Sequence, residues 1–291
     1  MKFNISIFLA FVAVMSLATG GIFVKLSSLQ PINTAFYRIL ISLFFLFPFV
    51  YKNLRKIDRK SYIIILCSGI FLAIDLILWN KSFLLTSVAN ANLFVNLVPF
   101  TTIPLSYFLF KERPSSNFLF GLVICILGIG VLMFGKFQVS AEGFQGDFLA
   151  FLASIFYGFF LLSVYKVRSK VDAPTLMFIS GLGSIPILAV AAEFSENIML
   201  PSSTHEWYIL LGLALCSQIF GQGLLSYCLG KINILLSSVI ILSQPVFAAI
   251  YAYFIFKETL SIQELGGIII ILFGVYFAKK EKKKNSIPDT I

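Results

Sequence analysis

Charged residues are scarce in this chain. Asp, Glu, Lys and Arg make up 12% of the 291 residues, whereas hydrophobic residues make up 59% and aromatic residues 16%. A soluble domain carries about a quarter charged residues, so this chain lacks the polar side chains that cover a water-facing surface. The high apolar and aromatic content also excludes a disordered chain. A soluble globular enzyme is therefore excluded, and the composition indicates a chain embedded in a membrane.

Metal-ligating and disulfide-forming residues are also few. The cysteines lie inside apolar runs without C-x-x-C spacing, at Cys67, Cys125, Cys216 and Cys228. We therefore expect packing residues, not a disulfide framework or a zinc site. The lone histidine, His205, cannot build a metal site by itself. The sequence also lacks a Walker loop, G-x-S-x-G and H-E-x-x-H, so we expect no cofactor, no direct drive by ATP and no catalytic residues.

Ten long apolar segments fill the chain instead. A helix that crosses a bilayer needs about 20 apolar residues, and barrel strands are disfavoured because the segments do not alternate in polarity. The first segment is longer than the apolar part of a signal peptide, so we expect an uncleaved helix. The sequence predicts an all-α integral membrane protein with ten transmembrane helices, at residues 5–26, 32–51, 61–79, 87–110, 118–135, 146–166, 173–193, 207–228, 234–256 and 264–278.

The basic residues are shared unevenly between the two ends of these spans. With a cytoplasmic N-terminus, 17 of the 22 Lys and Arg residues fall on the cytoplasmic side and four on the far side, while Arg38 lies inside a span. This bias sets orientation, so we expect both termini to be cytoplasmic, in a bacterial inner membrane. The net charge of +9 is then a topology signal and not a nucleic-acid surface, and the Lys-rich tail is expected to lie on anionic lipid.

The chain repeats itself after 146 residues. Residues 107–112 (YFLFKE) align with residues 253–258 (YFIFKE), and the same offset pairs Pro99 with Pro245, Gly121 with Gly267, and Gly128 with Gly274. We therefore expect two five-helix units, residues 1–140 and 141–291. Five is an odd number, so the second unit enters the membrane inverted. Inverted repeats are typical of secondary transporters, with the substrate site between the halves near the midplane.

These residues resemble the EamA-type transporters of the drug/metabolite transporter superfamily. The resemblance is carried by Asp75-x-x-x-Trp79-Asn80-x-Ser82, by residues 86–92 (TSVANAN), and by the second-half residues Gly221-Gln222-Gly223, Ser237-Ser238, Gln244-Pro245 and Gly266-Gly267. It covers about residues 5–278 and does not specify a substrate. It implies a ten-helix carrier whose central cavity is lined mainly by the first, third, fourth, sixth, eighth and ninth helices.

Only two charged residues lie well inside the predicted spans. We place Arg38 ~9 Å and Asp75 ~6 Å from the outer ends of their spans. Charged groups at membrane depth are costly and mark functional sites. Two interpretations stay open: a structural ion pair, or a cavity in which Asp75 holds an amine or a coupling proton and Arg38 meets a carboxylate.

Five amide side chains are further candidates for the substrate site. Asn92 and Asn96 are four residues apart on one span and share a helix face, and Gln218 and Gln222 do the same on another. Gln244 follows Ser237 by seven residues on the ninth span. Amides inside a membrane take their partners from another helix, water or a substrate, so helix–helix bonding is the alternative to cavity lining.

Two aromatic residues and two prolines complete the candidates. Phe23 and Tyr157 are candidates for stacking on an organic substrate, with ordinary packing as the alternative. Pro99 and Pro245 occupy equivalent positions in the two units. Each removes an intrahelical hydrogen bond, so each is a candidate hinge, with a simple kink as the alternative.

Together these features predict a secondary carrier, active or facilitative, that moves a small polar organic metabolite by alternating access. One acid and one base beside several amides favour an amino acid or a related zwitterion. The alternative is a cationic or nucleotide-like cofactor such as S-adenosylmethionine, and a membrane enzyme or scaffold is a remote third. The expected partners are the substrate and the lipid bilayer; a coupling proton and a homodimer are compatible with the sequence.

Overall fold

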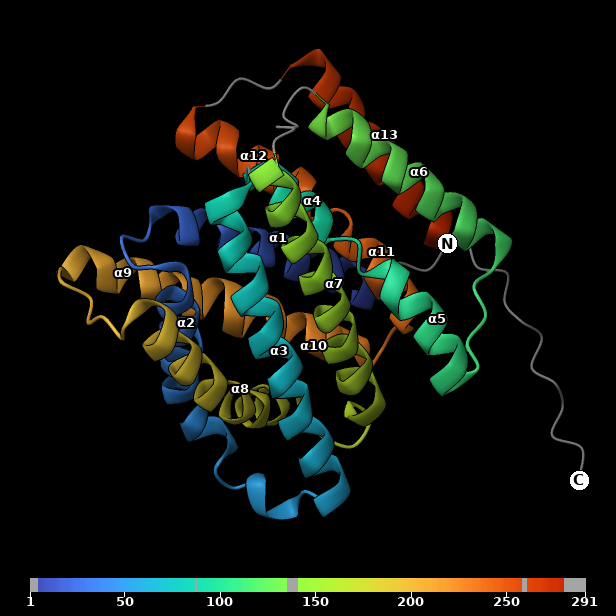
Figure 1. Cartoon of the computed structure of the whole chain (residues 1–291). Helices are drawn as coiled ribbons and strands as arrows, with labels where there is room; N and C mark the ends of the chain where they lie inside the picture. Colours follow the sequence, from blue (N-terminus) through green and yellow to red (C-terminus); the bar gives the residue numbers. More distant parts are fainter. Residues whose placement is uncertain (1–4, 87, 135–140, 258–260, 280–291) are drawn as a thin grey trace, which may run out of the picture.

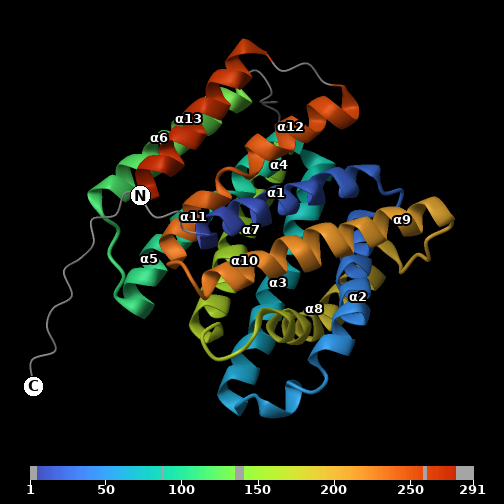
Figure 2. The same ribbon diagram turned by 180° about the vertical axis from the view of Figure 1, so that it is seen from behind.

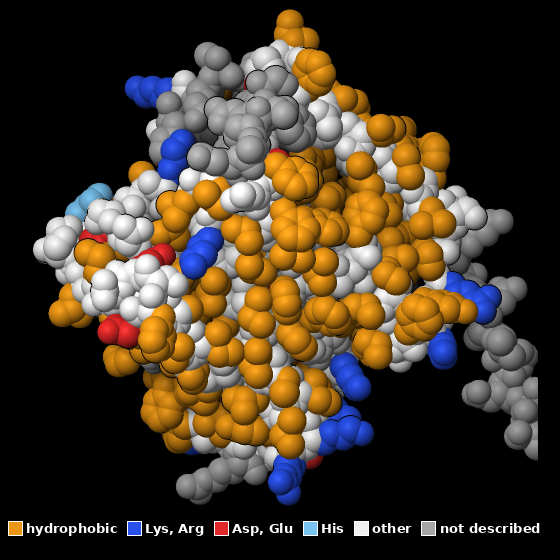
Figure 3. All heavy atoms as spheres, viewed as in Figure 1, with side chains coloured by type: hydrophobic (Ala, Val, Ile, Leu, Met, Phe, Trp, Pro, Cys, Tyr) orange, Lys and Arg blue, Asp and Glu red, His pale blue; other side chains and the backbone are white. Residues whose placement is uncertain are grey.

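The chain is all-helical throughout the part that the structure describes. The computed structural model describes residues 5–86, 88–134, 141–257 and 261–279, and each regular element in them is a helix (Figure 1). Nine helical segments are long and apolar enough to span a bilayer, and a shorter apolar helix covers residues 116–132. Figure 3 shows hydrophobic side chains over most of one face of the molecule. The protein is therefore a multi-pass membrane protein, as its composition predicts.

The described residues of the first half form six α-helices. They are α1 (Ile5–Leu26), α2 (Pro31–Val50), α3 (Arg59–Leu85), α4 (Val88–Val95), α5 (Pro99–Phe110) and α6 (Ser116–Met133), with a 3-10 turn, η1 (Leu54–Lys56), after α2. Two of them begin at side-chain caps: Asp58 accepts a hydrogen bond from the Ser61 amide, and Ser115 accepts one from the Phe118 amide. Such caps satisfy amides that have no partner within the helix.

The second half contains seven α-helices and one π-helical stretch. They are α7 (Ala141–Val167), α8 (Ala173–Glu196), α9 (Thr204–Gly212), the π-helical η2 (Leu213–Gln222), α10 (Gly223–Leu229), α11 (Ile234–Ile241), α12 (Gln244–Phe256) and α13 (Ile262–Lys279). The segments α9, η2 and α10 follow one another without a break and form one span, residues 204–229. Helix α8 begins at Asp172, which accepts a hydrogen bond from the Thr175 amide.

The two halves repeat each other in structure as well as in sequence. Helices α4 and α11 start and end 146 residues apart, and so do α6 and α13. The helices α5 and α12 both end at a lysine in the left-handed conformation, Lys111 with φ 58° and Lys257 with φ 54°. A lysine rarely adopts this conformation, so its recurrence at the repeat interval shows that the two units share one backbone path. Glu258 and the Lys-rich tail lie outside the described residues.

Helices α6 and α13 pack on each other around a local two-fold axis. They lie side by side along one edge of the molecule in both views (Figures 1 and 2). A methyl group on Gly121 would come 2.5 Å from the Ala278 amide nitrogen, and one on Gly267 would come 2.5 Å from the Leu132 nitrogen. Adding 146 to one member of the first pair and subtracting it from the other gives the second pair. A reciprocal contact of this kind requires two-fold symmetry, and it agrees with two inverted repeats.

The sequence predicts one continuous helix at residues 87–110 and another at 234–256. In the structure each of these spans is divided into two helices, α4 and α5 in the first half and α11 and α12 in the second. The breaks come just before the paired prolines: Pro99 is the first residue of α5 and Pro245 is the second residue of α12. A proline has no amide hydrogen and its ring displaces the preceding turn. The fourth span of each five-helix unit is therefore interrupted at the same place.

Helix α3 extends six residues beyond the expected end of its span. It runs to Leu85 rather than to Trp79, so Asp75 lies ten residues from the end of the helix. At 1.5 Å per residue this is a depth of ~15 Å, more than twice the depth expected from the sequence. The polar residues after Trp79 continue the helix because Asn80 donates to the Pro31 carbonyl oxygen at 2.9 Å and Ser82 donates to that of Trp79 at 2.6 Å.

Besides α6 and α13, several other segments pack across the two halves. Helix α3 packs on α7 and α8, α1 packs on η2, and α2 packs on its repeat counterpart α8. Glycines permit the closest of these contacts: the Gly69 and Gly183 backbones meet where α3 crosses α8. Small residues let helices approach closely in a membrane. This crossing arrangement surrounds the centre of the molecule with side chains from both halves.

Candidate functional site

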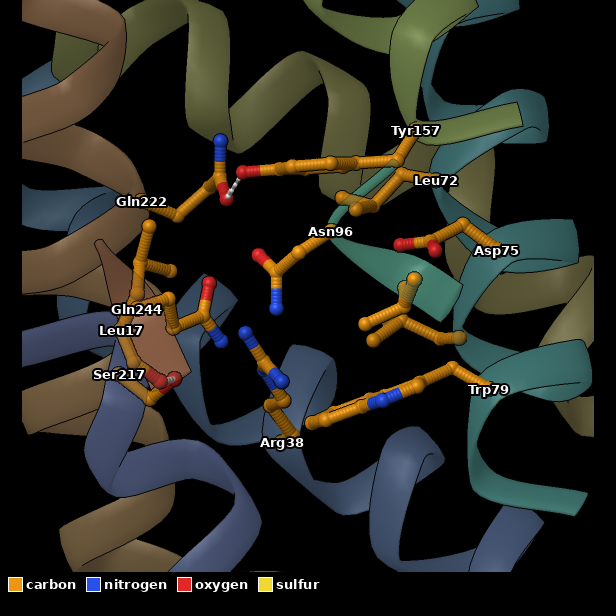
Figure 4. Close-up of a pocket in the computed structure, with 12 residues that line it drawn as sticks. Leu17, Arg38, Leu72, Asp75, Trp79, Asn96, Tyr157, Ser217, Gln222 and Gln244 are labelled. Atoms are coloured by element: carbon orange, nitrogen blue, oxygen red, sulfur yellow. Dashed lines mark hydrogen bonds between the residues drawn. The ribbon is translucent and has the colours of Figure 1, made fainter. Parts of the chain in front are cut away.

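A cavity of about 50 Å³ lies at the centre of the molecule, between the halves (Figure 4). Residues from α1, α2, α3, α7 and η2 contribute to its wall, and so do residues at the two helix breaks. Asn96 lies in the break between α4 and α5, and Gln244 directly follows the break between α11 and α12. The lining residues are Leu17, Arg38, Leu72, Asp75, Leu76, Trp79, Val95, Asn96, Tyr157, Ser217, Gln222 and Gln244.

Arg38 and Asp75 face this cavity from different helices. The side chains are buried, with 5% of Arg38 and 6% of Asp75 exposed. Arg38 Nε donates to Gln218 Oε1 at 2.8 Å, and the Arg38 and Asp75 charged groups lie on different sides of the cavity (Figure 4). Among the described residues, Arg38 and Asp75 do not form an ion pair, and Asp75 Oδ1 has no hydrogen-bond partner. The acid and the base are therefore both presented to the cavity.

The second half contributes a tyrosine and a cluster of polar side chains. Tyr157 Oη donates to Gln222 Oε1 at 2.8 Å, and the Tyr157 ring stacks on Phe160 with the planes 12° apart. Ser217 and Gln222 both reach the cavity from η2. In an α-helix these residues would point about 140° apart, because five residues advance about 500°. The wider i→i+5 turn of the π-helical stretch brings them to one face.

Three of the cavity's polar atoms are buried and have no partner within the described residues. They are Asp75 Oδ1, Trp79 Nε1 and Gln222 Nε2. A buried polar atom without a partner costs about 1–3 kcal/mol, so such atoms are rare and need an explanation. One acceptor and two donors around one small cavity form a set that a polar molecule can satisfy.

The structure brings six of the nine predicted site residues to the cavity wall. They are Arg38, Asp75, Asn96, Tyr157, Gln222 and Gln244. Gln218 belongs to the site through its bond to Arg38. Asn92 is buried but does not line the cavity, and its backbone carbonyl oxygen accepts from Asn96 Nδ2 at 2.6 Å. Phe23 does not line the cavity, because its ring packs against Gly212 of α9.

Sequence reasoning missed Trp79 and Ser217 as site residues. Trp79 follows Asp75 by four residues and therefore shares its helix face, so the spacing alone was a sufficient signal. Ser217 reaches the cavity only because its segment is π-helical, and no residue pattern in the sequence indicates this. The apolar wall residues, such as Leu72 and Leu76, are indistinguishable in sequence from ordinary packing residues.

Two carboxylates join the halves at one end of the molecule. Glu206 of α9 is buried and accepts hydrogen bonds from the Ser27 hydroxyl, the Ser28 hydroxyl at 2.7 Å and the Ser28 amide at 2.9 Å. Glu196, at the end of α8, accepts from the Ile32 and Asn33 amides at 3.0 Å. A carboxylate at the first amides of α2 also complements the helix dipole. Glu206 therefore holds the loop between α1 and α2 against the second half, and Glu196 holds the start of α2.

The opposite end is joined less tightly among the described residues. Tyr165 Oη donates to Glu112 Oε1 at 2.7 Å, and the exposed Asn53 amide reaches Asp172 Oδ2 at 3.4 Å. Exposed hydrogen bonds of this length contribute little. Among the described residues, the more extensive set of charge-assisted bonds between the halves therefore lies at the end that contains Glu206.

Comparison with known proteins identifies the family. The model of the EamA-like transporter family matches residues 4–134 and again residues 144–279. The chain belongs to the EamA-like transporter family. This EamA-like protein is therefore a membrane transporter of metabolites and not an enzyme, which removes the membrane-enzyme alternative.

Relatives of this EamA-like protein differ in what they are described to transport. It is 24% identical to an uncharacterized transporter of Archaeoglobus fulgidus, over 91% of this chain and 93% of that protein. It is 25% identical to a probable amino-acid metabolite efflux pump of Salmonella typhimurium, over 64% and 65% of the chains. It is also 25% identical to an S-adenosylmethionine uptake transporter of Rickettsia bellii, over 88% of each chain.

A solved crystal structure has the same fold. The two chains superpose with a TM-score of 0.78, and the match covers 94% of this chain and 96% of the other. At 16% sequence identity this likeness establishes the fold alone.

Proposed function

We propose that this protein carries a small polar organic metabolite, an amino acid or a related zwitterion, across the membrane by alternating access. The observation that supports the proposal is the set of partnerless polar atoms around one central cavity. Asp75 Oδ1 accepts hydrogen bonds or pairs with an amine, whereas Trp79 Nε1 and Gln222 Nε2 donate. Arg38 adds a guanidinium that suits a carboxylate. The amine of a zwitterion would pair with Asp75, and its carboxylate would accept from Trp79, Gln222 and Arg38.

The cavity must widen to hold such a substrate. Its volume of about 50 Å³ is well below the roughly 300 Å³ of a small ligand pocket. In the inverted-repeat mechanism, one half rocks against the other and opens the central site to each side in turn. We infer that the structure represents a closed state, in which the bonds to Glu206 and Glu196 seal one end.

We also propose that Asp75 carries the coupling proton when the substrate is absent. The buried carboxylate has no basic partner within the described residues, so it is better accommodated in the protonated form. An incoming amine would displace the proton and pair with the carboxylate in its place, while the substrate carboxylate meets Arg38. The basic residues favour an orientation with both termini in the cytoplasm, and the short loops favour a bacterial inner membrane.

Counterflow in proteoliposomes tests the proposal. The purified protein is reconstituted, loaded with unlabelled amino acids and exposed to the labelled amino acid that stabilises it most in a thermal-shift screen. Asp75→Asn is expected to lose the pH dependence of uptake and at least tenfold of the affinity. Glu193→Gln removes an exposed carboxylate near the end of α8 and serves as the control. If Asp75→Asn has wild-type rate, affinity and pH dependence, the role of Asp75 is excluded.

A cationic or nucleotide-like cofactor such as S-adenosylmethionine is the second candidate. It is favoured by the similarity to the S-adenosylmethionine uptake transporter over 88% of each chain. The Tyr157 ring, held by stacking on Phe160, would offer an aromatic surface to its base, and Asp75 would meet its charge. Competition of both compound classes against one labelled ligand distinguishes the two candidates.

A further inference from the structure

A groove lined by three basic side chains opens where α3 begins and α7 ends. It has a volume of about 530 Å³ and is lined by Arg59, Lys60, Ile63, Ile64 and Lys166. Arg59 and Lys60 are the first two residues of α3, and Lys166 is the penultimate residue of α7. Figure 3 shows Lys and Arg side chains gathered along the lower edge of the molecule, where Figure 1 places these two helix ends.

No acidic side chain lines this groove. The nearest acid in the chain, Asp58, accepts its hydrogen bond from the Ser61 amide as the cap of α3. Within the described residues, Arg59, Lys60 and Lys166 make no ion pair with any carboxylate. Cations in the first turn of a helix also oppose the helix dipole. The dipole of α3 therefore disfavours Arg59 and Lys60, whereas Lys166 lies in the last turn of α7, where a cation is favoured. An anion in the groove would offset the repulsion among the three cations and the repulsion between the α3 dipole and its first two residues.

The floor of the groove is apolar and continues along the membrane-spanning part of α3. Ile63 is 48% exposed, and Ile70, which follows it by seven residues on the same face, is 39% exposed. A free phosphate would gain nothing from these side chains. A lipid gains from both parts of the site, because its phosphate meets the cations at headgroup depth and its acyl chain covers the isoleucines.

The internal repeat offers a comparison within the same molecule. The positions equivalent to Arg59, Lys60 and Lys166 in the other unit are His205, Glu206 and Gly20. The apolar positions keep their character, because Ile63 and Ile64 correspond to Ile209 and Leu210. The basic groove is thus a feature of one end only. Orientation in the membrane explains why basic residues lie at this end, but it does not explain why three of them converge on one groove.

We propose that this groove binds the headgroup of one anionic phospholipid, such as phosphatidylglycerol. Arg59 and Lys60 belong to the first half and Lys166 to the second. A lipid bound by all three bridges the halves and stabilises the arrangement in which α3 and α7 meet at this end. Binding at this site is independent of the substrate proposed above.

Native mass spectrometry of the full-length protein in detergent tests the site. The protein is titrated with phosphatidylglycerol, with phosphatidylcholine of the same acyl chains, and with glycerol phosphate. The variant Arg59→Gln/Lys60→Gln/Lys166→Gln removes the groove cations. The matched control, Lys52→Gln/Lys111→Gln/Lys231→Gln, removes three exposed charges from the loops at the same end.

We expect wild type and the control to retain one phosphatidylglycerol at least tenfold more tightly than the groove variant does, and to prefer it to phosphatidylcholine. Phosphatidylglycerol should also raise the melting temperature of wild type and the control, and not that of the groove variant. Three results would overturn the proposal: equal binding by the groove variant, equal loss in the control, or binding of glycerol phosphate as tight as that of the lipid.

Discussion

Arg38 is buried at the centre of the molecule and donates its hydrogen bond to an amide oxygen. Gln218 Oε1 accepts from the guanidinium at 2.8 Å, so the positive charge is partly satisfied without a carboxylate. This leaves Asp75 Oδ1 unpaired at the cavity. A direct ion pair would have satisfied both charges within the protein and left less for a substrate to bind.

Replacing Gln218 should therefore destabilise the protein. Gln218→Leu removes the acceptor and leaves the Arg38 Nε–H buried, at an expected cost of about 1.5–3 kcal/mol because the donor is charged. Thermal unfolding in detergent measures this loss. Gln263→Leu, an exposed residue of α13, should change the stability by less than about 0.5 kcal/mol. An unchanged melting temperature in Gln218→Leu would show that Arg38 finds another partner.

Trp79 should contribute to affinity through its indole N–H. Trp79→Phe keeps an aromatic ring and removes the buried donor that has no protein partner. A net hydrogen bond contributes about 0.5–1.5 kcal/mol, so the affinity for the transported substrate should fall about 2- to 10-fold. Titration of the thermal shift with substrate measures it. Trp207→Phe, a residue 39% exposed on α9, is the control. Equal affinity in both variants would remove Trp79 from the site.

At the scale of elements, irregular backbone positions the polar side chains of the site. Asn96 and Gln244 lie at the interruptions of two spans, and Ser217 and Gln222 lie on a π-helical stretch. Regular helices satisfy their own backbone groups in a membrane, and irregular backbone is tolerated where it is buried or lines a cavity. The hinge role of Pro99 and Pro245 stays a prediction, which slower counterflow with unchanged affinity in Pro99→Ala would support.

The contact between α6 and α13 depends on glycine at particular positions. A methyl group on Gly121 would come 2.5 Å from backbone atoms of Gly274 and Ala278, whereas one on Gly130, on the same helix, would meet nothing within 4 Å. Gly121→Ala should therefore destabilise the protein by about 1–3 kcal/mol through overpacking. Gly130→Ala should stabilise it by up to about 1 kcal/mol. Thermal unfolding of the two variants compares them, and a stable Gly121→Ala protein would contradict this packing.

At the scale of the whole molecule, two similar halves are joined differently at their two ends. Glu206 binds the loop between α1 and α2 and Glu196 binds the start of α2, whereas the equivalents of these acids in the first half are Lys60 and Val50. The inverted repeat supplies two near-equal arrangements of the halves. The unequal ends then decide which arrangement is more stable.

Weakening the bonds to Glu206 should open that end of the molecule. Glu206→Gln removes the charge that strengthens three hydrogen bonds. We expect the substitution to destabilise the arrangement in which this end is closed by about 1.5–3 kcal/mol, which is more than a tenfold shift in population toward the open arrangement. In a protein whose four cysteines are replaced by alanine, Ser217→Cys reports access to the cavity. Labelling by an impermeant maleimide from the Glu206 side should become faster.

Glu193→Gln, an exposed acid at the same end, is the control for this experiment. It should label at the rate of the reporter protein alone. A labelling rate that Glu206→Gln leaves unchanged would show that these bonds do not hold the closed state.

Hydropathy was sufficient to predict the spans, and the match of the chain to itself at an offset of 146 residues was sufficient to predict the inverted repeat. Both signals are reliable because each is averaged over many residues. The same reasoning selected Asp75 and Arg38, since charge is rare at membrane depth. It also selected Phe23 and Asn92, which do not line the cavity in the structure, because a helix face indicates a direction and not the neighbour that occupies it. It also overlooked Ser217, whose direction depends on a π-helical turn.

The sequence by itself determined that the chain lies in a membrane, that it consists of two similar halves, and that few of its charges are buried. These properties depend on composition and on periodicity, and both can be read from the sequence without knowing which helices pack together. Only the tertiary structure decided that Arg38 donates to Gln218 rather than pairing with Asp75, and that Glu206 binds Ser27 and Ser28. Such pairings join residues about 180 positions apart, and they depend on the register at which helices from the two halves pack.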